Sequence, residues 1–246
     1  MDVLEVIAAK RTGQHAIISW IVRNLTDKVL TLQNNLGVIK LEYVNDRLLY
    51  WNDGNNNQPF GLKLFKETGW SENLENLIIN YEDVTQHYSF FSKNEIYRGS
   101  LSYDRFDDIK VKHGKRLVIL RNFYNCLASR YKQNISGEHP HPYDQKFIDI
   151  WKDNAKFVIN NPKQSLKYED WLNNPQKRKE ILFDFFSINE RYSPEMISGR
   201  SSSFEKSNYN NRIDEVNLPQ EIKDLIRNDN ELHYLMGTLG YQYKEI

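Results

Sequence analysis

Apolar residues along this chain follow two periods, one typical of buried strands and one typical of helices. Residues 2–9 form a short apolar run that a turn signal stops, and from Ala16 onward the apolar residues recur three or four positions apart. The sequence therefore predicts a buried strand, a short loop and a helix. Further strands are predicted at 77–80, 117–120 and 165–167, and further helices after 121, around 145–158, after 170 and over 219–239.

Strands that alternate with helices are typical of an open, mostly parallel sheet with helices on both faces. The segment 31–72 departs from this pattern, because it is rich in Asn and Gly and its periodicity is too weak for a core element. We expect it to be a surface excursion or a substrate-side insertion, with one possible strand at 47–51. No repeat, linker or low-complexity segment divides the chain, so we expect a single α/β domain over residues 1–246.

The charge balance and the apolar runs limit the classes of function. Lys plus Arg and Asp plus Glu both number 33, so the formal net charge is zero. This balance argues against a protein that coats nucleic acid or an anionic membrane. The N-terminal MDVLEVIAAKR is not a secretory signal, and no apolar run approaches the roughly 20 residues of a membrane helix, so we expect a cytoplasmic protein.

Cysteine and histidine usage points away from disulfides and metals. The single cysteine, Cys126, excludes an intrachain disulfide and a zinc site built from several cysteines. It falls in an apolar helical pattern without a nearby His, so we expect a buried structural thiol rather than a nucleophile. His139 and His141 lie in EHPHP without a third ligand, and we expect a substrate-side loop there and no metal.

The segment KRTGQH, residues 10–15, follows the first strand and opens a helix. Ligands of a parallel sheet bind beyond the carboxyl ends of its strands. Free N–H groups and the positive end of the dipole at a helix start bind phosphate or sulfate. Gly13 lets the backbone approach such a ligand, and Arg11 supplies a permanent charge. The spacing G-x-x-x-x-G-K-[ST] of a phosphate loop is absent, so another anion site is predicted.

A second anion site is predicted where the strand at 117–120 ends. Arg121 follows that strand, and Ser129 comes eight residues later, about two turns into the next helix. An Arg and a Ser hydroxyl make a good phosphate clamp. The acidic turns 81–83 and 168–170 follow two other strands and face the same edge. Two anion sites together suggest a ligand with two separated anionic groups.

In their order and spacing these motifs resemble the sulfotransferases that use 3′-phosphoadenylyl sulfate (PAPS). KRTGQHAIISWI is similar to the family's first motif, in which a strand, a basic residue, Ser or Thr, Gly and two polar residues open a helix. LVILRNFYNCLASRY is similar to the second motif and LKYEDW to the Tyr-Glu-Asp turn, while GRSSSF loosely matches a basic loop. The resemblance spans residues 2–240 and is thin between 31 and 72. It implies a sulfotransferase fold, like that of the P-loop kinases, with a mostly parallel central sheet flanked by helices.

The resemblance also implies a cofactor. PAPS would be the sulfuryl donor and 3′,5′-adenosine diphosphate the product, without a metal. The 5′-phosphosulfate would lie on the turn 11–16 and the 3′-phosphate on Arg121 and Ser129, with Arg200 as a further donor. Tyr168 would contact the adenine. The cofactor-binding residues would be Lys10, Arg11, Thr12, Gly13, Gln14, His15, Ala16, Arg121, Ser129, Tyr168, Arg200 and Ser201.

Sulfuryl transfer needs stabilised charge and a base for the acceptor. Its loose transition state carries charge that must be held in place, and Arg11 occupies the position of the family's catalytic Lys or Arg. Gln14 and His15 stand where the family often has two hydroxyl residues, and amide and imidazole N–H groups can replace those contacts. The candidate bases are His15, Glu82, Asp83 and His87.

Simpler explanations of these residues remain open. Arg11 could pair with a surface acid, Glu82 or Asp83 could cap a helix that begins near Val84, and Arg121 could be structural.

Three functions are therefore compared. The first is a sulfotransferase that acts on a hydroxyl, or an amine, of a small molecule or glycan, without nucleic acid or membrane partners. The second is a kinase of related topology, which the missing Gly-Lys-Ser/Thr opposes because no residue is placed to hold magnesium. The third is a non-catalytic nucleotide-binding module. The acceptor and the oligomeric state are left open by the sequence.

Overall fold

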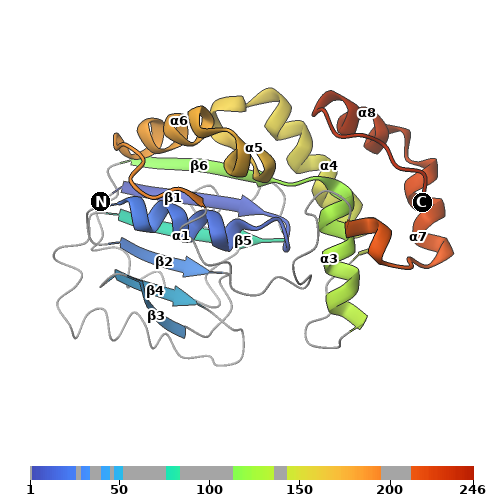
Figure 1. Ribbon diagram of the computed structural model, residues 1–246, viewed down its shortest axis with the longest axis horizontal. Helices are drawn as coiled ribbons and strands as arrows, with labels where there is room; N and C mark the ends of the chain where they lie inside the picture. The colour runs from blue at the N-terminus through green and yellow to red at the C-terminus, as the bar shows by residue number, and fades with distance from the viewer. Residues whose placement is uncertain are drawn as a thin grey trace, which may run out of the picture.

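The computed structural model describes residues 2–25, 29–33, 40–44, 47–51, 76–83, 113–135, 143–194 and 212–246. Within these ranges seven strands form one sheet in the order β3-β4-β2-β5-β1-β6-β7 (Figure 1). The strands are β1 (Asp2–Ala8), β2 (Val29–Gln33), β3 (Lys40–Val44), β4 (Arg47–Trp51), β5 (Asn76–Glu82), β6 (His113–Leu120) and β7 (Ser165–Lys167).

The sheet is mostly parallel, as predicted. β1 lies between β5 and β6 and runs parallel to both. β2 extends the parallel set beyond β5 and β7 extends it beyond β6, whereas β3 is antiparallel to β4 at one edge. Parallel pairing brings the carboxyl ends of β1, β5, β6 and β7 to the same edge, where ligands of such sheets bind.

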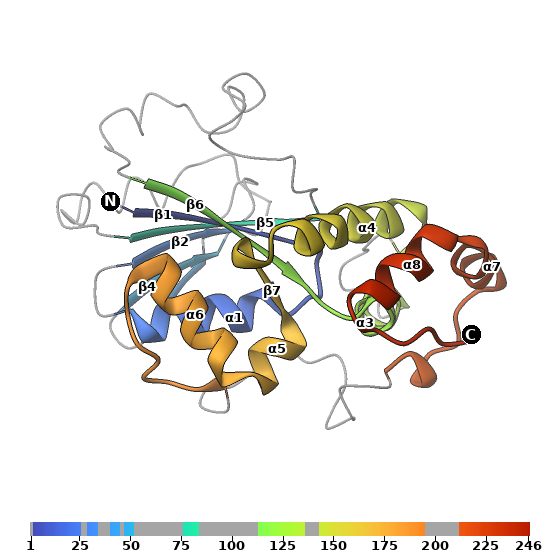
Figure 2. The ribbon, with the colours of Figure 1, turned by 90° about the horizontal axis from the view of Figure 1, so that it is seen from above.

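Helices cover both faces of the sheet. Alternate strand residues point to opposite faces, so Leu4 and Val6 pack under one helical layer and Ile7 and Val118 under the other. α1, α5 and α6 lie together on one face, and α3, α7 and α8 gather near the end of the strands (Figure 2). The helices are α1 (Gln14–Asn24), α3 (Phe123–Ile135), α4 (Gln145–Asn160), α5 (Tyr168–Asn173), α6 (Pro175–Phe186), α7 (Gln220–Asn228) and α8 (Asn230–Thr238).

The prediction that 31–72 is an irregular excursion is wrong where the structure describes that segment. Parts of it form β2, β3 and β4 of the central sheet, and the possible strand at 47–51 is confirmed as β4. Short strands near a sheet edge gain order from main-chain pairing with a neighbour, so their own apolar pattern is a weak guide.

Smaller differences concern the ends of elements. α1 begins at Gln14, two residues before the predicted start. The acidic turn 168–170 is the first turn of α5 rather than a loop before a helix. The helical tail is two helices, because Asp229 ends α7 and its side chain accepts a hydrogen bond from the N–H of Leu232 in α8. None of the helices that the structure describes is long and apolar enough to cross a membrane.

Cys126 lies on α3 inside the core, fully shielded from solvent. This burial confirms the predicted structural thiol. Burial raises the pKa of the thiol to about 11, although the charges of Arg121 and Arg130 lower it in part. At such a pKa the reactive thiolate is scarce at neutral pH.

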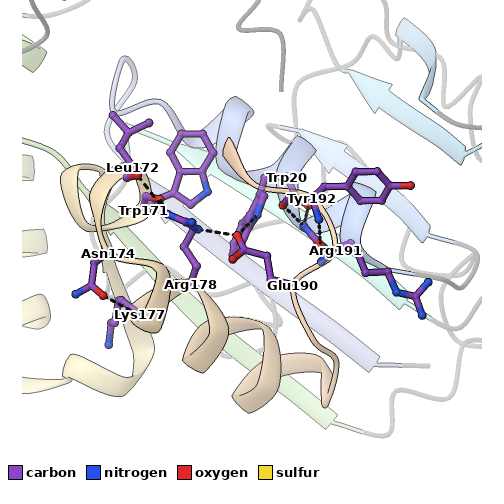
Figure 3. Close-up of polar contacts among 10 residues, drawn as sticks. Trp20, Trp171, Leu172, Asn174, Lys177, Arg178, Glu190, Arg191 and Tyr192 are labelled. Atoms are coloured by element: carbon purple, nitrogen blue, oxygen red, sulfur yellow. Dashed lines mark hydrogen bonds and ion pairs between the residues drawn. The ribbon is translucent and has the colours of Figure 1, made fainter. Parts of the chain in front are cut away.

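A buried ion pair holds the segment after α6 against α1 (Figure 3). Arg178 Nε donates to Glu190 Oε1 at 2.6 Å, and its Nη1 donates to the Trp171 carbonyl at 3.0 Å. Trp20 Nε1 on α1 donates to the same Glu190 oxygen at 3.2 Å. The ion pair therefore links α1, α5 and α6 on one face of the sheet.

The Asn24 side chain makes a second link between α1 and this segment. Its Oδ1 accepts from the N–H groups of Arg191 at 2.6 Å and Tyr192 at 2.9 Å. Its Nδ2 donates to the carbonyls of Trp20 and Tyr192. Four hydrogen bonds at one buried amide fix the path of the chain after α6.

Replacing Asn24 with Leu should lower the free energy of unfolding by about 2–3 kcal/mol, because two half-buried N–H groups lose their acceptor and the buried amide loses its four hydrogen bonds. Urea unfolding followed by far-UV circular dichroism measures this change. The exposed Asn173→Leu is the matched control and should stay within about 0.5 kcal/mol of the wild type. Equal midpoints for the two variants would contradict the role given to Asn24.

Cys126 should resist alkylation in the folded protein. With the pKa at about 11, roughly one thiol in a thousand is ionised at pH 8, and burial also blocks the reagent. Iodoacetamide at pH 8 should leave native protein unmodified over the time in which it fully modifies protein in urea, as measured by intact mass. Rapid labelling of the native protein would show that the thiol is accessible.

Candidate functional site

The turn between β1 and α1 presents backbone N–H groups at the carboxyl edge of the sheet. Arg11 and Gly13 both have left-handed backbone, with φ of +74° and +88°. Gly13 is the N-cap of α1, and no side chain of the described residues caps it. The first N–H groups of a helix have no acceptor within the helix, so the turn is suited to an anion.

Gly13 also lies against Tyr168, the first residue of α5. A Cβ atom added to Gly13 would lie 2.3 Å from Tyr168 Cε2 and 2.5 Å from Cδ2, which no real side chain tolerates. The ring of Tyr168 therefore requires glycine at this position, in addition to the left-handed backbone. The first and third sequence motifs are therefore in direct contact.

Arg121 follows β6 at the same edge, and its side chain is only 4% exposed. Its Nη1 donates to the Arg11 carbonyl at 3.2 Å, and its guanidinium carbon lies 4.6 Å from the centroid of the Tyr168 ring. Its Nε and Nη2 have no acceptor among the described residues. Buried charged donors without acceptors are costly, and an anionic group at this position would satisfy them.

Ser129 lies on α3, buried, on the side that faces the β1–α1 turn. Its Oγ accepts a hydrogen bond of 3.0 Å from Arg11 Nε, across 118 residues of sequence. Ser129, which the sequence predicts as part of the second anion site with Arg121, thus contacts the first motif. This contact and the hydrogen bond from Arg121 to the Arg11 carbonyl place the two predicted anion sites next to each other.

The polar residues at the start of α1 differ in exposure. Thr12 is buried, and its hydroxyl donates to Gln14 Oε1 at 2.7 Å. Gln14 is buried as well, so its carbonyl oxygen is turned toward the loop. His15 and Ala16 are half-buried. Of Gln14 and His15, His15 is thus the more exposed to solvent.

Asp83 at the end of β5 has partners within the protein. Its Oδ1 accepts from the Lys10 N–H at 2.9 Å and from Arg130 Nη1 at 2.6 Å. Sequence reasoning singled out Asp83 as a candidate base and missed Arg130. The available signal was a cation directly after Ser129 in an otherwise apolar helical stretch, because such a cation needs an acidic partner.

Glu169, beside Tyr168, ties the second motif to the C-terminal segment. Its carboxylate accepts from the Asn122 N–H at 3.0 Å and from the Tyr241 hydroxyl at 2.8 Å. Burial and the negative charge of Glu169 raise the pKa of Tyr241 well above its ordinary value, so the phenol stays protonated and donates. Glu169 therefore supports the site instead of offering a free carboxylate.

Several predicted residues cannot be compared with the structure. The backbone of Glu82 pairs with Ala8 at the end of β1, which places Glu82 at the expected edge. The remaining candidates lie outside the described residues: His87, His139, His141, Arg200 and Ser201. Within the described ranges, no group of three His, Cys, Asp or Glu residues is placed to bind a metal.

Comparison with known proteins adds little to this geometry. No protein-family model matches the chain, and no curated protein matches it. Among solved structures, the chain is similar to the sulfotransferase domain from the curacin biosynthetic pathway, at 13% identity over 99% of each chain, with a TM-score of 0.44. A likeness at this level carries no inference about reaction or substrate.

Proposed function

We propose that this protein is a sulfotransferase that moves the sulfuryl group of PAPS to a hydroxyl, or an amine, of a small molecule or glycan. One observation supports the proposal above the others. Among the described residues, Nε and Nη2 of the buried Arg121 have no acceptor, and its Nη1 donates to the carbonyl of Arg11, which itself contacts Ser129 just before a helix start that suits a second anion. Two neighbouring anion sites match a donor with phosphate groups at both its 3′ and 5′ positions.

In this proposal Arg121 and Ser129 bind the 3′-phosphate, and the turn 11–16 binds the 5′-phosphosulfate. Tyr168, which already stacks against Arg121, offers its ring to the adenine. PAPS supplies an activated sulfuryl group, whose S–O bond to the 5′-phosphate breaks as the acceptor oxygen bonds to sulfur. Arg11 neutralises the charge that develops on the leaving oxygens.

A base takes the acceptor's proton as the new S–O bond forms. The candidates at this edge are His15, Glu82, Asp83 and, outside the described residues, His87. The proposal includes a cytoplasmic location and a reaction without a metal. It leaves the acceptor to experiment.

The nucleotide site is tested by calorimetry with 3′,5′-adenosine diphosphate. The wild type should bind it, and Arg121→Ala should bind it roughly 10- to 100-fold more weakly, because charge-assisted hydrogen bonds to the 3′-phosphate are lost. Arg227→Ala, an exposed arginine of α7, is the control and should bind like the wild type. A wild type that shows no binding at saturating nucleotide would end the proposal.

Arg11→Ala should reduce turnover more than nucleotide binding. The side chain acts on charge that develops only in the transition state, so kcat should fall by roughly 100- to 1000-fold. The affinity for 3′,5′-adenosine diphosphate, which lacks the sulfuryl group, should change by less than about threefold. An acceptor found by screening for the mass gain of one sulfuryl group provides the rate assay.

Arg11→Lys is the control, because it keeps the charge and should retain much of the rate. A loss of nucleotide affinity in Arg11→Ala without a loss of kcat would contradict the role of Arg11.

A further inference from the structure

Asp83 sits where the end of β5 meets the end of β1. Its N–H donates to the Ala8 carbonyl at 3.0 Å, which continues the pairing of the two strands by one residue. Its backbone is left-handed, with φ of +55°, an uncommon conformation for a residue other than glycine. This backbone and its pairing place the carboxylate beside the peptide of Lys10.

The carboxylate of Asp83 is occupied by an internal cation. Arg130 Nη1 and Nη2 donate to its two oxygens at 2.6 and 3.2 Å, in a two-point pairing. The Arg130 side chain is fully buried, that of Asp83 is 15% exposed, and the guanidinium also packs 4.5 Å from the centroid of the Phe147 ring. A pair this buried is held in one geometry.

The Asp83–Arg130 pair forms hydrogen bonds with both the backbone N–H and the backbone carbonyl of Lys10. Asp83 Oδ1 accepts from the Lys10 N–H at 2.9 Å, and Arg130 Nη1 donates to the Lys10 carbonyl at 3.2 Å. Arg11, the next residue, has left-handed backbone and contacts Ser129. Any displacement of the Lys10 peptide would therefore move Arg11 and the start of α1.

We propose that Asp83 and Arg130 are positioning residues that hold the Lys10 peptide, and through it Arg11 and the anion-binding turn, in the geometry for sulfuryl transfer. This inference rests on the proposed function. It removes Asp83 from the candidate bases, because three of the roughly four acceptor positions of its carboxylate are already used.

The double variant Asp83→Ala/Arg130→Met tests the positioning role without leaving a lone buried charge, since hydrophobic replacement of a buried ion pair is often tolerated. Its urea midpoint should stay near that of the wild type. In ligand-free protein, hydrogen exchange of the Lys10 amide should become at least roughly tenfold faster, because its acceptor is gone. Affinity for 3′,5′-adenosine diphosphate should fall by about tenfold. Wild-type exchange at Lys10, or wild-type affinity despite faster exchange, would overturn the inference.

The pair Arg178 and Glu190 provides a matched control, because its shortest contact is also 2.6 Å and it is also buried. Arg178→Met/Glu190→Ala should leave the Lys10 exchange rate and the nucleotide affinity unchanged, even if its midpoint falls. Equal effects of both double variants on Lys10 would mean that the turn responds to any loss of packing, and the positioning role would be wrong.

The single variant Asp83→Asn distinguishes a positioning role from a role as the catalytic base. It also replaces the double variant as the test if the double variant does not fold. A positioning residue predicts faster Lys10 exchange, weaker nucleotide binding and a pH profile of kcat that keeps its acid limb. A base predicts unchanged binding and loss of that limb. Exchange at Lys10 needs no ligand, so it tests the inference even if the wild type binds no nucleotide and the proposed function fails.

Discussion

Two buried guanidinium groups hold the β1–α1 turn by consecutive carbonyls, since Arg130 donates to the carbonyl of Lys10 and Arg121 to that of Arg11. The positive charges of these two arginines have different partners. Arg130 has Asp83 as its own counter-ion, whereas Arg121 faces the ring of Tyr168 and keeps two donors unpaired among the described residues. A buried cation is tolerated when an anion accompanies it. Arg130 is thus part of the protein's framework, whereas Arg121 has two donor nitrogens that the proposed nucleotide phosphate would satisfy.

The rest of the site depends on how closely elements approach this turn. Gly13 allows the ring of Tyr168 to lie where any side chain would clash, and Glu169 fixes the start of α5 to Asn122 and Tyr241. Because α5 follows β7 directly, a short edge strand delivers the aromatic ring to the turn. The order of the strands and the size of one residue together create the contact.

The sequence allowed us to predict which strand ends meet at the carboxyl edge of the sheet. It did not allow us to predict which side chains pair with one another there. Strand ends are visible as polar residues after apolar runs, and parallel pairing must bring them to one edge, so Arg11, Arg121 and Ser129 were expected to meet. The partner of Asp83 was not expected, because nothing in a sequence tells which carboxylate a helical arginine reaches. The strands β2 and β3 were missed because main-chain pairing with neighbours, rather than their own pattern, makes them strands.

In the proposed reaction, the strand order also places the two substrates on different sides of Arg11. β6 and β7 lie on one side of β1 and supply Arg121 and Tyr168, the residues proposed to hold the nucleotide. β5 lies on the other side and ends at Glu82, with Asp83 directly after it, and the proposed function would place the acceptor and its base there. Because the Asp83 carboxylate is engaged by Arg130, the proposed base is to be sought among Glu82, His15 and His87. In-line transfer requires the acceptor oxygen and the leaving 5′-phosphate oxygen to lie on opposite sides of the sulfur, so with the 5′-phosphosulfate proposed on the β1–α1 turn, the proposal places the acceptor toward β5.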